Sequence, residues 1–72
     1  MATVYQTDLE QARQRLSEGL ARLREQASQV EALTREGKPT ESARDLLNAI
    51  QTTIHDLEIQ VRFLAETEGR QD

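Results

Sequence analysis

The second half of the chain carries one strict repeat of apolar residues. The repeat advances in alternating steps of four and three residues and consists of Ala43, Leu47, Ile50, Ile54, Leu57, Val61 and Leu64. Steps of this kind keep every member on one face of an α-helix. The pattern therefore predicts a long amphipathic helix with an almost purely aliphatic face.

The first half carries a broader and shallower apolar stripe. Its seven-residue repeat is formed by Leu9, Leu16, Leu23 and Val30. The alternate positions hold Ala12, Gly19, Gln26 and Leu33, and one residue further along lie Leu20 and Ala27. The small residues would let another helix approach closely. Gln26 is expected either to reach a polar partner or to lie at an edge of the stripe.

A turn signal separates the two helical patterns. Gly37 can adopt the left-handed conformation that ends a helix, and Pro39 lacks the N–H needed to continue one. Thr40 follows as an N-cap whose hydroxyl is expected to accept a hydrogen bond from an amide of the next turn. The connection of about three or four residues is typical of antiparallel helix neighbours.

The start of the first helix is marked by a T-x-x-E capping box made of Thr7 and Glu10. Thr3 and Gln6 offer an alternative, earlier cap. The sequence thus predicts an all-α fold, an antiparallel two-helix hairpin with helices at about 8–36 and 41–68, in a single domain over residues 1–72.

Self-association is expected, because two helices touch along one line and cannot hide both stripes. A chain of 72 residues also falls in the range where one core rarely supplies more than ~3–5 kcal/mol. Two hairpins can share a core as a four-helix bundle with coiled-coil packing. A homodimer is the first expectation, and a monomeric hairpin, a hairpin bound to a different protein and a higher oligomer are the alternatives. The predicted self-association core is Leu9, Leu16, Leu20, Leu23, Val30, Leu47, Ile50, Ile54, Leu57, Val61 and Leu64.

Composition argues against several classes of protein. Cysteine is absent, which removes disulfides, thiolate metal sites and cysteine nucleophiles. The net charge is -4, and the basic residues are interleaved with acidic ones, whereas a nucleic-acid binder needs a basic stripe. No segment approaches the roughly 18 apolar residues of a membrane span, and the first residues lack a basic start followed by an apolar run. We expect a soluble, cytoplasmic chain that does not engage a membrane.

The sequence shows no recognisable catalytic motif. It has no Gly-rich phosphate loop, no H-E-x-x-H motif and no Cys/His cluster, and the residue three before His55 is Thr52, where di-iron bundles carry Glu. We therefore expect a protein without catalytic, cofactor-binding or metal-binding residues, and not an enzyme.

The helix break itself supports a resemblance. Gly37, Thr40, Ala43, Leu46 and Leu47 form a G-x-x-T-x-x-A-x-x-L-L pattern. It resembles the break between two amphipathic helices in a group of short uncharacterised bacterial proteins. The resemblance implies a helical hairpin and no particular activity.

Two further functions stay open as alternatives. His55, in the stretch H-D-x-x-x-Q that ends at Gln60, resembles the phosphorylated histidine of one class of sensor kinases, whose dimerisation domains are helical hairpins. In those kinases the histidine belongs to the first helix and a nucleotide-binding domain follows, whereas here it belongs to the second. The other alternative is a dimeric bundle that binds RNA or DNA on the more basic first helix, which carries Arg13, Arg15, Arg22, Arg24 and Arg35.

The first expectation for function is a protein–protein interaction or regulatory module. Ile59 and Phe63 lie one turn apart on the back of the second helix, where the bundle core cannot easily bury them. They are a candidate patch for a partner protein, since apolar anchors dominate binding energy. The plainer alternatives are ordinary exposed apolar residues or a cover formed by Val4 and Tyr5 of a neighbouring chain.

Overall fold

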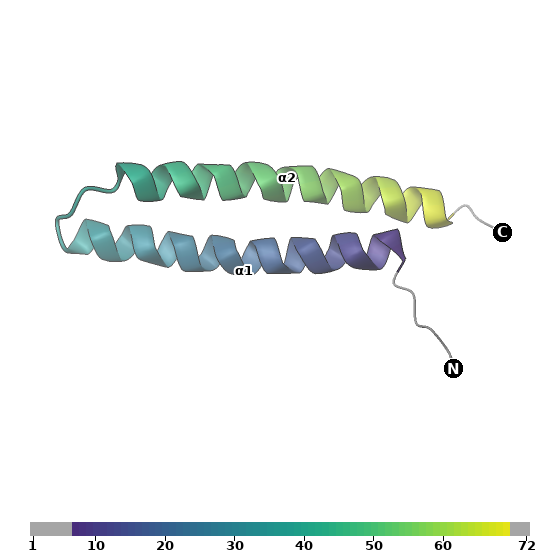
Figure 1. Cartoon of the computed structure of the whole chain (residues 1–72), viewed down its shortest axis with the longest axis horizontal. Coiled ribbons are helices and arrows are strands. Elements are labelled where there is room, and N and C mark those ends of the chain that lie inside the picture. Colours follow the sequence, from purple (N-terminus) through teal and green to yellow (C-terminus); the bar gives the residue numbers. More distant parts are fainter. Residues whose placement is uncertain (1–6, 70–72) are drawn as a thin grey trace, which may run out of the picture.

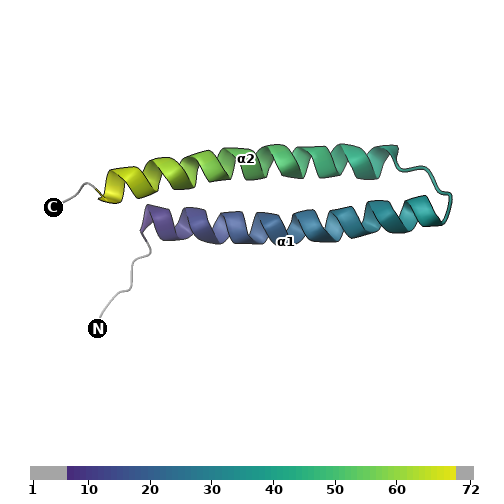
Figure 2. The same cartoon turned by 180° about the vertical axis from the view of Figure 1, so that it is seen from behind.

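The chain folds into two antiparallel helices that lie side by side along their whole length (Figure 1). The computed structural model describes residues 7–69 and contains α1 (Asp8–Arg35) and α2 (Glu41–Gly69). The reverse view shows the same pairing, with the turn at one end and the start of α1 beside the end of α2 at the other (Figure 2). The predicted all-α hairpin is confirmed, and each helix begins and ends within a residue of its predicted bounds. Thr3, Val4, Tyr5 and Gln6 lie outside the described residues.

The first turn of α1 is capped from its own sequence. The Oγ1 atom of Thr7 accepts a hydrogen bond from the main-chain N–H of Glu10 at 3.0 Å, as the capping box predicts. The Thr7 hydroxyl in turn donates to Oε1 of Glu10 at 3.2 Å. One of the amide groups that a helix leaves without an intrahelical partner is thereby satisfied.

The turn ends α1 through a Schellman motif. Gly37 has a φ of 69°, the left-handed conformation that glycine adopts without steric cost. The amide of Lys38 donates to the carbonyl of Leu33 at 2.9 Å, and the amide of Gly37 donates to that of Thr34 at 3.1 Å. The predicted role of Gly37 is confirmed.

Thr40 precedes α2 as predicted, but its hydroxyl takes a different partner. Its Oγ1 accepts from Nε of Arg44 at 3.0 Å, and its carbonyl oxygen accepts from the amide of Arg44 at 2.8 Å. Arg44 lies one turn further on, so its long side chain can reach back to the hydroxyl. A hydrogen bond from a charged donor is stronger than one from a neutral amide, which favours this arrangement.

The interface between α1 and α2 is narrow and contains few fully covered side chains. Among the described residues, the buried ones are Ala12, Val30, Ile54 and the polar Gln26. No large side chain in this part of the chain is completely enclosed. The rest of the two stripes is half-buried, except for the exposed Leu20, because the hairpin offers cover on one side only.

Two of the contacts between the helices involve residues of the α1 stripe. A Cβ atom placed on Gly19 would lie 3.3 Å from Cγ1 of Ile54, so the missing side chain allows the close approach that small residues predicted. The Nε2 group of Gln26 donates to the carbonyl oxygen of Ala43 at 2.9 Å. Of the two arrangements predicted for Gln26, the structure shows the one in which its side chain reaches a polar partner.

Within residues 7–69, neither helix is apolar over a length that could cross a membrane.

Candidate functional site

One side of the hairpin is hollowed by a groove of about 420 Å³ between the two helices. From α1 the lining residues are Arg15, Glu18, Gly19 and Arg22. From α2 they are Leu46, Ala49, Ile50, Thr53 and Leu57. We call this hollow the α1/α2 groove. Its α2 side is apolar and its α1 side is charged.

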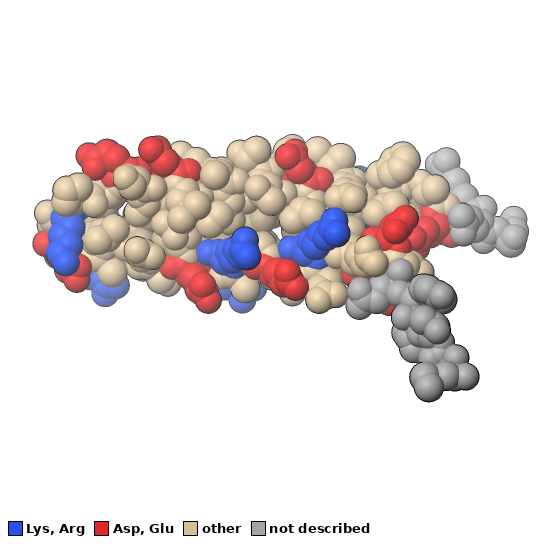
Figure 3. Space-filling view, viewed as in Figure 1, with Lys and Arg blue, Asp and Glu red and all other residues tan. Residues whose placement is uncertain are grey.

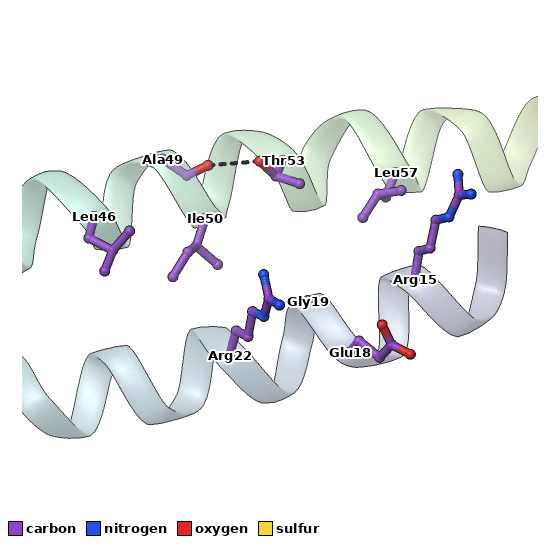
Figure 4. Close-up of a pocket in the computed structure, with 9 residues that line it drawn as sticks. All are labelled: Arg15, Glu18, Gly19, Arg22, Leu46, Ala49, Ile50, Thr53 and Leu57. Atoms are coloured by element: carbon purple, nitrogen blue, oxygen red, sulfur yellow. Dashed lines mark hydrogen bonds between the residues drawn. The ribbon is translucent and has the colours of Figure 1, made fainter. Parts of the chain in front are cut away.

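The close-up of the groove shows how its side chains divide the space (Figure 4). Leu46, Ile50 and Leu57 extend from α2 toward α1, and the side chains of Arg15 and Arg22 extend from α1 toward α2. The Thr53 hydroxyl donates to the carbonyl oxygen of Ala49 at 3.1 Å, so it is satisfied within its own helix. The groove thus presents aliphatic groups beside two guanidinium groups.

Gly19 lines the α1 side of the groove. Because this residue has no side chain, Ile54 and Leu57 approach the α1 backbone, to 3.3 Å and 3.9 Å from the position a Cβ atom would take. The missing side chain of Gly19 therefore lets α2 approach α1 closely beside the groove.

Charged side chains of both helices are visible on the face drawn in Figure 3. Basic and acidic groups alternate along α1, acidic groups lie along the outer edge of α2, and uncharged residues gather over the seam between the helices. The pattern gives mixed rather than uniformly positive potential. It suits a surface that pairs with complementary charges.

The residues predicted as the self-association core lie mostly between the two helices of one hairpin. Val30 and Ile54 are buried and Leu20 is exposed. Half-buried positions are held by Leu9, Leu16, Leu23, Leu47, Ile50, Leu57, Val61 and Leu64. The two stripes therefore face each other, and one edge of the α2 stripe, at Ile50 and Leu57, also opens into the α1/α2 groove.

Exposed large apolar side chains remain on both helices. They are Leu20 at 37%, Ile59 at 49%, Leu46 at 52% and Phe63 at 65% of their surface. Ile59 and Phe63, predicted together as a partner patch, are thus both accessible in the hairpin. Leu46, which lines the α1/α2 groove, is a third such residue on α2.

One contact between the helix ends was not predicted. Oε1 of Glu68 accepts a hydrogen bond from the main-chain N–H of Leu9 at 3.3 Å, joining the end of α2 to the start of α1. The sequence does contain a pattern that could have predicted this contact. Glu68 follows Ile54 and Val61 at seven-residue intervals, so it continues the face of α2 that is turned toward α1. The carboxylate also lies at the positive end of the α1 dipole.

The arginines of α1 do not form one basic stripe. Arg15 and Arg22 are two helical turns apart on the groove side, whereas Arg13 and Arg24, about three turns apart, share the opposite side. All four are exposed. A nucleic-acid backbone would meet only part of this charge on any one face.

His55 lies on the surface of α2. His55 is exposed and follows the buried Ile54, on the side of α2 away from Thr53 and the groove. Within residues 7–69, no group of three His, Cys, Asp or Glu side chains is arranged to hold a metal ion.

Comparison with protein-family models, curated proteins and solved structures finds no match to the chain.

Proposed function

We propose that this protein is a non-enzymatic helical-hairpin module that pairs with a second copy to form a four-helix bundle and presents the bundle surface to another protein. The observation that supports pairing is the poor cover of the apolar stripes within one hairpin. Among the described residues, the only large apolar side chains of the stripes that are buried are Val30 and Ile54, and neither is completely enclosed. Apolar side chains are stabilised in proportion to the area removed from water, so a second hairpin adds the cover that is missing.

Exposed apolar residues on both sides of the seam support the same proposal. Leu20 belongs to one side and Leu46 to the other, where it lines the α1/α2 groove. Small domains compensate for thin cores by self-association when disulfides and metals are absent. Cysteine is absent from this sequence.

Sedimentation equilibrium at micromolar concentration tests pairing. The expected result is twice the mass of one chain, with a melting temperature that rises with protein concentration because association stabilises the folded state. Ile54→Asp places a charge in the buried interface and should abolish both helicity and the dimer. Ile59→Asp is the matched control, because Ile59 is 49% exposed and should tolerate the change. A monomeric mass with full helicity would contradict the proposal.

Ile59 supports the second part of the proposal, a surface for another protein. It lies on the side of α2 turned away from α1, where the shared core of a bundle cannot reach it. Affinity capture with the wild-type chain and with Ile59→Glu compares recovery of a partner. The variant should keep its helicity and dimer mass and lose the partner.

A further inference from the structure

A row of exposed residues follows the side of α2 that is turned away from α1. Ile54 is buried against α1, and Asp45 stands nine residues before it and Phe63 nine residues after it. Nine residues are two and a half helical turns, so both lie on the side opposite Ile54. Steps of three, four or seven residues keep further members on this side. The row, which we call the outer stripe, consists of Asp45, Thr52, Asp56, Ile59, Phe63 and Glu66.

The apolar part of the outer stripe is a pair of side chains one turn apart. Ile59 is 49% exposed and Phe63 is 65% exposed. Phe63 has the largest exposed fraction of any large apolar side chain within residues 7–69. An aromatic ring that leaves water contributes strongly to an interface. A partner that covers both side chains therefore gains more here than over any other pair on α2.

Acidic residues flank this pair at both ends. Asp56 lies three residues before Ile59, and Glu66 lies three residues after Phe63, each about one turn away on the same side. The view in Figure 3 shows acidic groups along the outer edge of α2. The outer stripe itself contains no basic residue. The apolar pair therefore stands between two negative charges.

The arginines of α2 lie beside the outer stripe and do not cancel its charge. Arg62 is the nearer one to the apolar pair, and it stands four residues from both Glu58 and Glu66, the spacing at which ion pairs form on a helix. Nε of Arg44 donates to the hydroxyl of Thr40 at 3.0 Å, which turns this side chain back toward the start of α2. The outer stripe therefore keeps a negative potential.

We propose that the outer stripe binds a basic amphipathic segment of another protein, whose apolar side chains cover Ile59 and Phe63 and whose cations pair with Asp56 and Glu66. The proposal rests on the partner surface proposed above and adds the chemistry of the partner. Apolar anchors supply most of the binding energy at such a contact. Complementary charges around them select the correct partner and speed its approach.

The spacing within the outer stripe defines the partner segment. From Asp56 to Glu66 the stripe advances by three, four and three residues, which spans about 15 Å along the helix. A helix laid along α2 matches it with a cation, two apolar residues and a second cation at the same spacing. The order acid, apolar, apolar, acid reads the same in both directions, so the charges admit a parallel or an antiparallel helix. A contact of about three turns is smaller than a standard interface, and we expect weak, reversible binding.

A second copy of this chain does not fit the outer stripe. Reversed docking that brings Ile59 opposite Phe63 of the partner subunit also brings Asp56 opposite Glu66 of the partner subunit, so that like charges meet. Docking in the same direction sets each acid against its own copy. The phosphates of nucleic acids and of anionic lipids are repelled for the same reason. A basic protein segment satisfies both the apolar pair and its acidic flanks.

Two synthetic helical peptides test the charge of the partner. One repeats the spacing of the outer stripe with leucine for the apolar pair and lysine for the two acids, and the other carries glutamate in place of lysine. Fluorescence anisotropy of each labelled peptide, titrated with the whole chain, measures binding. The lysine peptide should bind at least about tenfold more tightly than the glutamate peptide. The difference should narrow as the salt concentration rises, because salt screens exposed charges.

A charge swap on the protein provides the matched test. Asp56→Lys combined with Glu66→Lys should reverse the preference, so that the glutamate peptide binds more tightly. Glu25→Lys combined with Glu31→Lys, on α1, changes the net charge equally and should keep the preference for the lysine peptide. All four positions are exposed, so helicity should be retained. Phe63→Ala should weaken binding of the lysine peptide at least about tenfold.

Three results would overturn the basic partner: equal binding of the two peptides, no binding of the lysine peptide, or an unchanged preference in the charge-swapped variant. A loss of dimer mass in Ile59→Glu would assign this side of α2 to the pairing of two copies, and it would also overturn the proposal. The partner surface of the proposed function fails by a separate result, which is the recovery of a partner by Ile59→Glu in affinity capture.

Discussion

Gln26 on α1 and Ala43 on α2 are joined by a hydrogen bond of 2.9 Å from the side-chain Nε2 to the main-chain carbonyl oxygen. Gln26 is 8% exposed, so its amide has little access to water. A slip of α1 against α2 would leave this amide buried without a partner, at a cost of about 1–3 kcal/mol. The pair therefore fixes the axial register of the hairpin more than it adds to stability.

Gln26→Leu should keep or raise the free energy of unfolding by up to about 1 kcal/mol. The change removes a buried polar group, and the Ala43 carbonyl keeps its intrahelical hydrogen bond from Leu47. Gln26→Ala should lower the free energy by about 1–2 kcal/mol, because it leaves a gap in the interface. Urea unfolding of both variants at one protein concentration gives the comparison. Equal losses in the two would mean that the hydrogen bond itself stabilises the hairpin.

Gly19→Ala should leave the free energy of unfolding within about 0.5 kcal/mol of the wild type. Alanine gains about 1 kcal/mol over glycine in a helix interior, but here its Cβ would lie 3.3 Å from Cγ1 of Ile54 and push the helices apart. Gly19→Val should lower the free energy by about 2 kcal/mol, because the larger side chain cannot fit. Thermal and urea unfolding measure both. A full gain of 1 kcal/mol for Gly19→Ala would show that the close approach is absent in solution.

The hairpin could be predicted because its decisive signals are local. Thr7 with Glu10 caps a helix over three residues, and Gly37 ends one through its own backbone conformation. The steps of four and three in α2 define a face without any knowledge of α1. Each of these features lies within a few turns of the chain, so it can be read from the order of residues.

The contacts between the helices could not be predicted in the same way. Whether Gln26 meets Ala43, or Glu68 meets the amide of Leu9, depends on the axial position of one helix against the other. That position results from the fit of many half-buried side chains, with Gly19 against Ile54 as the closest. The α1/α2 groove was missed for the same reason, since four of its residues come from one helix and five from the other.

Gly37→Val should lower the free energy of unfolding by about 1–2 kcal/mol, and Gly37→Asn by clearly less. The φ of 69° is strained for a β-branched residue, whereas asparagine tolerates the left-handed region. Nothing lies within 4 Å of the position of a Cβ atom on Gly37, so the loss comes from the backbone and not from a clash. The difference between the two variants in urea unfolding is the measurement. Equal losses would place the origin of the effect elsewhere.

Glu68→Ala should loosen the end of the hairpin where the two helices meet. The variant removes the acceptor of the Leu9 amide, which lies 3.3 Å from Oε1, and it removes a negative charge from the positive end of α1. We expect a loss of about 0.5–1 kcal/mol in the free energy of unfolding and faster hydrogen exchange at the Leu9 amide. Glu68→Gln separates the two causes, because its side-chain oxygen can still accept the hydrogen bond while the charge is lost. If the charge contributes, high salt should reduce the difference in the free energy of unfolding between the wild type and Glu68→Gln. The difference between Glu68→Gln and Glu68→Ala, which reflects the hydrogen bond, should stay the same at high salt. Exchange at the amides of the Schellman turn should stay unchanged in both variants, since that turn lies at the other end of the hairpin, and faster exchange there would show that the contact supports the whole hairpin.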